Sequence, residues 1–179
     1  FRGGARQDRA GPPGEAGDRG ASASVPEAPT LLLVADGMGG AVGGAEAARM
    51  AALTLHQALS ARNGRPDEPG GTAATLLQAT QLAHREIRRR GWSDLGLRGM
   101  GTTLTAALVE GDALHLVQVG DSRALLLRHG ILTQLTRDQS MVQDMVDSGV
   151  LTPEQARSSP HRNVILQALG GEDPLEPVG

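Results

Sequence analysis

The sequence contains no cysteine, no tyrosine and no lysine, because all 17 of its basic residues are arginines. Without cysteine there are no disulfides, no thiolate zinc sites and no cysteine nucleophile of the kind that tyrosine phosphatases use. Without lysine there is no P-loop lysine, no Schiff base and no kinase-type strand lysine. The aromatic residues are one phenylalanine and one tryptophan, which excludes a stacking platform for single-stranded nucleic acid.

Charge and hydropathy exclude two further classes of partner. A net charge of −3 argues against electrostatic binding to nucleic acid or to an anionic membrane. No apolar run approaches the roughly 18 residues that span a bilayer, and the first residues, Phe1 to Gly4, are neither a start methionine nor a signal peptide. We therefore expect a soluble, cytoplasmic monomer of one domain, cut from a longer chain, with no nucleic-acid partner and no membrane segment.

The first half of the chain predicts one strand followed by two helices. Residues 1–29 are rich in Gly, Pro, Ala and Arg without periodicity, which is typical of an irregular segment. The apolar run 30–35 predicts a strand buried on both faces. Helix formers and apolar spacing predict helices over about 45–61 and 72–90, the second capped by Thr72.

The second half predicts strands and then short helices. Residues 102–135 read as a meander of antiparallel strands, with turns at 110–112, 120–121 and 129–130. A short helix is predicted over 140–148, ending before Gly149, and another begins after Thr152 as N-cap. This order of elements predicts an α+β domain in which helices pack on an antiparallel sheet.

The stretch Asp36-Gly37-Met38-Gly39-Gly40 is the most informative one for chemistry. A carboxylate that leaves a buried strand for a glycine-rich loop is fixed at its base and accessible at its tip. The glycines let backbone carbonyls approach a cation or substrate closely. An ordinary strand-to-helix turn capped by Asp36 explains the same residues, so spacing alone leaves both interpretations open.

A second carboxylate, Asp121, follows a predicted strand in Gly120-Asp121-Ser122-Arg123. Two such carboxylates suit Mg²⁺ or Mn²⁺ better than zinc. Spacing alone favours a tight turn in which Asp121 accepts backbone hydrogen bonds. The five histidines lack the i, i+4 spacing of a zinc protease and no serine stands in a hydrolase elbow, so the histidines are expected to be structural or exposed.

Several short segments between residues 31 and 171 carry a resemblance when they are taken in order. They are VADGMGG (34–40), GMGTT (99–103), VGDSRA (119–124), LTRDQS (135–140), SGVLTPEQA (148–156), PHRN (160–163) and ALG (168–170). In this order and spacing they resemble the metal-dependent Ser/Thr protein phosphatase family, type 2C, in its bacterial form.

The resemblance implies a fold and a reaction. The fold is an α+β sandwich of two antiparallel sheets flanked by helices (four layers, αββα), here incomplete, over residues 30–179, with 140–168 as a mobile flap. In the implied reaction, two Mn²⁺ or Mg²⁺ ions hold a hydroxide that attacks phosphoserine or phosphothreonine, and a third ion binds loosely. The implied partners are phosphorylated Ser/Thr proteins and a Ser/Thr kinase.

The resemblance also implies roles for individual residues. Asp36 would be the catalytic residue that bridges both metals, and the Gly37 carbonyl would ligate one of them. Asp121 would bind the third metal, Asp8 would be a further metal ligand, and Arg2 would bind phosphate. The flap, with a role in substrate selection rather than chemistry, would contribute Ser140, Gly149, His161, Arg162 and Asn163.

The chain also departs from the family pattern. Arg6 stands where the family has Asn, Arg2 lies one residue too far from Asp8, and Ala41 and Gln139 stand where bacterial members have His. The chain stops at residue 179, before two further metal-binding aspartates of the family pattern. We therefore expect these 179 residues alone to bind metal poorly and to show little or no turnover.

Two function classes remain open from the sequence. One is the metal-dependent phosphatase, and the other is a catalytically inactive, phosphatase-like module that binds phosphoproteins in regulation. A reading frame that continues into the missing aspartates would favour the enzyme, and an immediate stop codon would favour the module. Nucleotide binding by the loop 37–44 is disfavoured, because the loop has neither a P-loop lysine nor a spaced Gly-x-Gly-x-x-Gly pattern.

Overall fold

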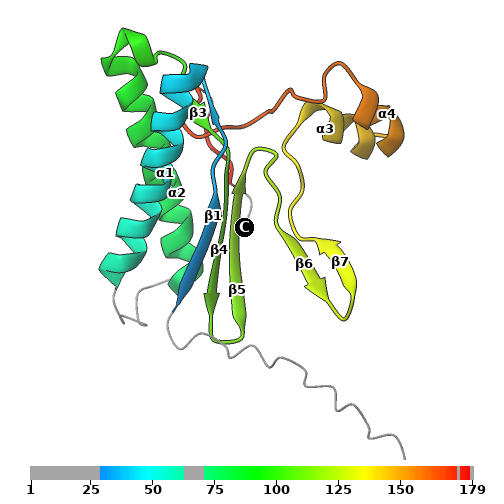
Figure 1. Cartoon of the computed structure of the whole chain (residues 1–179), viewed down its shortest axis with the longest axis horizontal. Helices are drawn as coiled ribbons and strands as arrows, with labels where there is room; N and C mark the ends of the chain where they lie inside the picture. Colours follow the sequence, from blue (N-terminus) through cyan, green and yellow to red (C-terminus); the bar gives the residue numbers. More distant parts are fainter. Residues whose placement is uncertain (1–28, 63–70, 173, 178–179) are drawn as a thin grey trace, which may run out of the picture.

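A computed structural model describes residues 29–62, 71–172 and 174–177 of the chain (Figure 1). Arg2 and Asp8 therefore lie outside the described residues. The elements are β1 (Thr30–Val34), β2 (Gly37–Met38), α1 (Gly40–Arg62), α2 (Gly71–Ser93), the 3₁₀ helix η1 (Leu95–Leu97), β3 (Gly101–Thr102), β4 (Leu104–Glu110), β5 (Ala113–Val119), β6 (Leu125–Arg128), β7 (Ile131–Gln134), α3 (Met141–Asp147) and α4 (Pro153–Ser158).

The centre of the fold is a three-stranded antiparallel sheet of order β1-β4-β5. The long helices α1 and α2 lie side by side against one face of it (Figure 1). The core fills the space between these two layers, and its largest fully buried apolar side chains are Leu55, Leu76, Ile87, Leu104, Val117, Val119 and Leu169. Mixed helix and antiparallel sheet confirms the predicted α+β class.

The prediction that the first strand is buried on both faces is wrong. Leu31 and Leu33 of β1 pack against the core, whereas Leu32 and Val34 are 58% and 59% exposed. Side chains alternate between the two faces of a strand, and α1 and α2 cover only one face of the sheet. In the part of the chain that the structure describes, α1 and α2 form one helix layer on this sheet, and the remaining strands form the two-stranded antiparallel sheets β2–β3 and β6–β7.

The predicted meander is also wrong in one respect. The turns at 110–112 and 129–130 do form hairpins, β4–β5 and β6–β7. The hairpin β6–β7 is a separate two-stranded sheet, however, and does not continue the ladder from β5. The chain leaves the sheet at Gly120, whose φ of 96° lies in the region that favours glycine.

Both long helices begin earlier than the apolar pattern predicts. α1 begins at Gly40, so the predicted glycine-rich loop is in fact β2 followed by the first turn of a helix. α2 begins at Gly71, so Thr72 lies inside the helix and not at its N-cap. Thr72 is buried, and its hydroxyl donates to the Glu110 carboxylate at 2.5 Å, a long-range bond that no local pattern reveals.

The two short helices confirm their predicted signals. Ser140 caps α3 by accepting a hydrogen bond from the Gln143 amide, and Gly149 follows the helix with a φ of 75°. Thr152 and Gln155 form a capping box at the start of α4, with Pro153 at its first position. None of the helices in the described residues has both the length and the apolar character required to span a bilayer.

Candidate metal site

The register of the central sheet brings the two predicted carboxylates to one end of it. Val34 pairs with Thr105, and Leu104 pairs with Val119. The end of β1, the start of β4 and the end of β5 therefore meet at the same edge. Asp36 lies two residues beyond the end of β1 and Asp121 two residues beyond the end of β5, so both follow a strand at this edge.

Thr103 connects the two turns at this edge. Its hydroxyl accepts a hydrogen bond from the Asp36 amide (3.1 Å), and its own amide donates to the Asp36 carbonyl (2.9 Å). The same hydroxyl lies 2.8 Å from that of Ser122, the residue after Asp121. Because Thr103 is 2% exposed, this bridge is held inside the protein and fixes the backbone on which Asp36 stands.

The turn that carries Asp121 is held by side chains from the sheet. The Gln118 amide group donates to the carbonyls of Gly120 (3.0 Å) and Ser122 (3.3 Å), and the Thr105 hydroxyl donates to Ser122 as well (2.6 Å). Asp121 itself accepts no hydrogen bond from the described residues, so the sequence-based interpretation that its carboxylate caps this turn is wrong. Gln118 and Thr105 stabilise the turn through its backbone carbonyls, and no described residue bonds to the carboxylate.

Asp36 and Asp121 differ in this respect from several other aspartates. Asp138 is 6% exposed and is held by Arg123 through three hydrogen bonds of 2.5 to 3.1 Å. This pairing raises the pKa of Arg123, with a smaller contribution from the charge of Asp121. Among the described residues no arginine forms a hydrogen bond or ion pair with the carboxylate of Asp36 or Asp121. Asp36 is exposed and Asp121 is half-buried.

The chemistry of these two groups fits a divalent cation. Carboxylate oxygens are the hard ligands that Mg²⁺ and Mn²⁺ prefer. Gly37 is required beside them, since a Cβ there would lie 2.0 Å from the Gly44 carbonyl oxygen at the start of α1. Within residues 29–62, 71–172 and 174–177, no three histidine, aspartate or glutamate side chains lie close enough to hold a metal. The described residues therefore offer two carboxylates of a larger ligand set.

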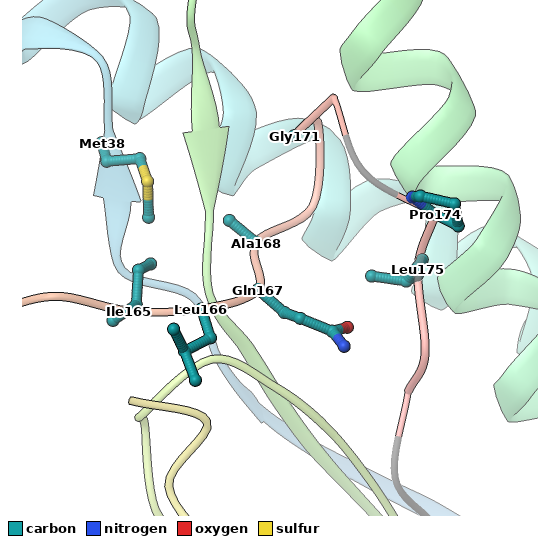
Figure 2. Close-up of a pocket in the computed structure, with 8 residues that line it drawn as sticks. All are labelled: Met38, Ile165, Leu166, Gln167, Ala168, Gly171, Pro174 and Leu175. Atoms are coloured by element: carbon teal, nitrogen blue, oxygen red, sulfur yellow. The ribbon is translucent and has the colours of Figure 1, made fainter. Parts of the chain in front are cut away.

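A small cavity of about 180 Å³ lies between β2 and the segment that returns from α4 (Figure 2). Met38 of β2 forms one side of it, and the segment 165–168 together with Gly171, Pro174 and Leu175 forms the rest. None of these residues is charged. The cavity therefore has no cationic side chain to bind a phosphate, and the polar end of the sheet is the better candidate for chemistry.

The two ends of the predicted flap lie next to each other and are joined by backbone hydrogen bonds. Ser140 and Ile165 form an antiparallel bridge, the Met141 amide donates to the Val164 carbonyl (2.9 Å), and the Leu166 amide donates to the Gln139 carbonyl (2.8 Å). Between these ends α3 and α4 project away from the central sheet (Figure 1). The remaining predicted flap residues are exposed; they are Gly149, His161, Arg162 and Asn163.

Sequence reasoning missed four polar residues that build this site. Thr103, Thr105 and Gln118 hold the backbone of the two turns, and Gln139 bonds to Gly120. A signal was present for Gln118 and Thr105, because each is a polar residue flanked by apolar residues in its strand. Which groups they bond to depends on the pairing of β4 with β5 and could not be inferred from spacing.

Comparison with known proteins identifies the family to which the chain is similar. A family model described as Protein phosphatase 2C matches residues 5–162. The chain is 44% identical over 149 residues to the serine/threonine protein phosphatase PstP of Mycobacterium tuberculosis, which covers 83% of this chain and 28% of that protein. It is 37% identical over 147 residues to the serine/threonine phosphatase stp of Listeria monocytogenes, covering 82% of this chain and 58% of that protein.

A solved structure is similar as well. The crystal structure of the catalytic domain of the serine/threonine protein phosphatase PstP, in complex with two manganese ions, is 41% identical and superimposes with a TM-score of 0.69. The similarity covers 83% of this chain and 59% of that one. The chain therefore spans less than two thirds of these relatives.

Proposed function

The chain belongs to the protein phosphatase 2C family, and on this basis we propose that the native protein is a metal-dependent protein serine/threonine phosphatase. It would hydrolyse phosphoserine and phosphothreonine with metal-activated water. One observation carries the proposal: the sheet register brings Asp36 and Asp121 to one edge, on fixed backbones and with carboxylates that pair with no residue the structure describes. The manganese ions in the solved PstP domain support the choice of metal.

Asp36 would be the bridging ligand, with the Gly37 carbonyl and Asp8 as further ligands, Asp121 on a looser ion and Arg2 on the phosphate. Bound Mn²⁺ or Mg²⁺ would lower the pKa of water and neutralise charge on the phosphoryl group. Thr103 keeps the Asp36 backbone in place through two hydrogen bonds, so that little reorganisation is needed when a cation binds. The exposure of Asp36 leaves room for a phosphorylated side chain.

The substrate-selecting role is assigned to the segment 140–168, which projects beside this edge of the sheet. Its exposed residues His161, Arg162 and Asn163 offer hydrogen-bond donors to a phosphoprotein, and Ser140 and Gly149 bound the helix α3 that carries the segment outward. We further propose that residues 30–179 belong to one phosphatase domain. The protein would be a cytoplasmic monomer that opposes a Ser/Thr kinase.

The alternative, an inactive phosphoprotein-binding module, has less support. A module without catalysis has no need for two carboxylates at the same end of the sheet that no described residue pairs with. Both carboxylates are present here and neither is neutralised by an arginine of the described residues. The enzyme is therefore the better explanation of this edge.

The proposal is tested by assaying the native protein on a phosphothreonine peptide. We expect phosphate release that requires Mn²⁺, stops with a chelator, and is lost in Asp36→Asn because a bridging charge is removed. Asp112→Asn is the matched control, since Asp112 lies in the β4–β5 turn at the opposite end of the sheet and should leave the rate unchanged. Undiminished, chelator-resistant release, or unchanged Mn²⁺ affinity of Asp36→Asn in calorimetry, would contradict the assignment.

A further inference from the structure

Gln139 forms hydrogen bonds with three other parts of the chain, at Gly120, Leu166 and Glu176. The side chain is 7% exposed, and its Oε1 accepts a hydrogen bond from the Gly120 amide at 2.6 Å. Its backbone amide donates to the Gly120 carbonyl at 3.0 Å, so both polar backbone groups of Gly120 bond to one residue. Its carbonyl accepts from the Leu166 amide (2.8 Å), and its Nε2 donates to the Glu176 carbonyl (3.3 Å).

The neighbours of Gln139 are held just as firmly. Asp138 is bound by Arg123, and Ser140 caps α3. Together the three residues form a buried root from which the segment 140–168 departs, and the segment returns to the same root at Leu166. A movement of this segment as a body must pivot at the root, because both of its ends bond there.

Gly120 links Gln139 to Asp121, because it bonds to Gln139 and directly precedes Asp121 in the chain. Its φ is 96°, and a Cβ there would lie 2.7 Å from the Thr103 Cγ2, so the turn has little freedom to adopt another shape. Gln118 also donates to the Gly120 carbonyl, but among the described residues only Gln139 accepts from its amide. Loss of the Gln139 side chain would leave the Gly120 N–H without its partner, directly before Asp121.

We infer that Gln139 is a positioning residue that presents Asp121 to a divalent cation and couples that cation to the root of the segment 140–168. This inference rests on the proposed function, because it takes the cation as the ligand of Asp121. The coupling is reciprocal by thermodynamic linkage. A cation bound to Asp121 stabilises the position of the root, and displacement of the root lowers the affinity of Asp121 for the cation.

The test compares two substitutions in the native protein. Gln139→Met keeps the length and approximate volume of the side chain and removes both of its polar groups. Gln167→Met is the matched control, because Gln167 also bonds to the Glu176 backbone (3.0 Å) but its side chain forms no bond to Gly120. In a Mn²⁺ titration by calorimetry we expect Gln139→Met to weaken the loosest site on the order of tenfold, and the control to stay within about twofold.

A second measurement leaves Gln139 unchanged. In hydrogen exchange with mass spectrometry, saturating Mg²⁺ should slow exchange of the peptide around Leu166 in the wild type. Asp121→Asn should abolish this slowing. If Gln139→Met does not fold, this comparison of wild type with Asp121→Asn still tests whether the cation is coupled to the root. A role of Gln139 in packing alone would lower stability but leave the Mg²⁺ response in place.

The outcomes separate this inference from the proposed function. If the wild type binds no Mn²⁺, the proposed function fails and the inference fails with it. If the wild type binds Mn²⁺ but folded Gln139→Met binds it equally well, only the inference is overturned. If the wild type binds Mg²⁺ but the exchange rate of the peptide around Leu166 does not change, the inferred coupling is overturned.

Discussion

At the scale of single residues, the hydrogen-bond partner of an aspartate indicates whether it stabilises the fold or is available to a ligand. Asp138 is buried and committed to Arg123, whereas Asp121, seventeen positions earlier in the chain, has a carboxylate without a hydrogen-bond donor among the described residues. Both residues stand in segments that resemble the phosphatase family. Only the structure distinguishes an aspartate that stabilises the fold from one that is available to a ligand.

Asp121→Ala is therefore expected to separate function from stability. The substitution removes a cation ligand, so metal affinity and phosphatase activity should fall. The free energy of unfolding should change by less than about 0.5 kcal/mol, because the Asp121 carboxylate forms no hydrogen bond with the described residues. Urea denaturation of the metal-free protein measures this value. A loss as large as that of a core truncation would instead show that the carboxylate holds the turn.

At the scale of elements, one histidine joins α2 to the segment that returns from α4. His84 is 7% exposed, and its Nδ1 accepts a hydrogen bond from the Gly170 amide at 3.2 Å. Burial, aided by the charge of Arg88, lowers the pKa of His84 below its ordinary value of 6.5. Only the neutral form of this histidine can accept the Gly170 hydrogen bond, so the lowered pKa and the hydrogen bond favour the same form.

This shift predicts a loss of stability in acid. Because the folded pKa lies below the unfolded one, the unfolded chain binds more protons as the pH falls. The contribution of His84 is complete above pH 6.5 and decreases as the pH falls below 6.5 toward the folded pKa. We expect the urea midpoint to fall between pH 7.5 and pH 5.5, and to fall less in His84→Gln, which keeps an oxygen acceptor for Gly170. An equal fall in both proteins would assign the pH dependence to other groups.

At the scale of the whole molecule, the core lies on one side of the central sheet. Leu104 is fully buried between the sheet and the helices, whereas Leu32 is 58% exposed on the other side of β1. The apolar side chains Leu32, Val34 and Leu114 leave this face of the sheet partly open to solvent in the described structure. The stability of the 179 residues should then depend almost entirely on the helix-covered face.

A pair of substitutions in the 179-residue chain tests this distribution. Leu104→Ala opens a cavity in the core and should cost about 2–5 kcal/mol in the free energy of unfolding. Leu32→Ala removes a side chain that is already largely solvated and should cost less than about 1 kcal/mol. Denaturant titration gives both values. Equal losses would mean that the exposed face of the sheet is covered in solution.

Much of the fold was predictable from local signals. The strand 30–34, the two hairpins of β4–β5 and β6–β7 and the caps of α3 and α4 follow from turn chemistry, periodicity and capping residues, which act over a few positions. The short sequence segments from 34–40 to 168–170 were also sufficient to identify the family. The start of α1 at Gly40 was not predictable, because glycines disfavour a helix and only the packing of α1 on β2 and β3 overrides that preference.

The sequence by itself determined the family, the class of fold and the identity of Asp36 and Asp121 as candidates, because these depend on residue types in a fixed order. The tertiary structure alone decided that the two carboxylates share one edge, that β1 is buried on one face, and that Gln139 bonds to Gly120. These features depend on strand register and on contacts between residues far apart in the chain. Local propensity carries no information about such contacts, since they form only when the layers pack together.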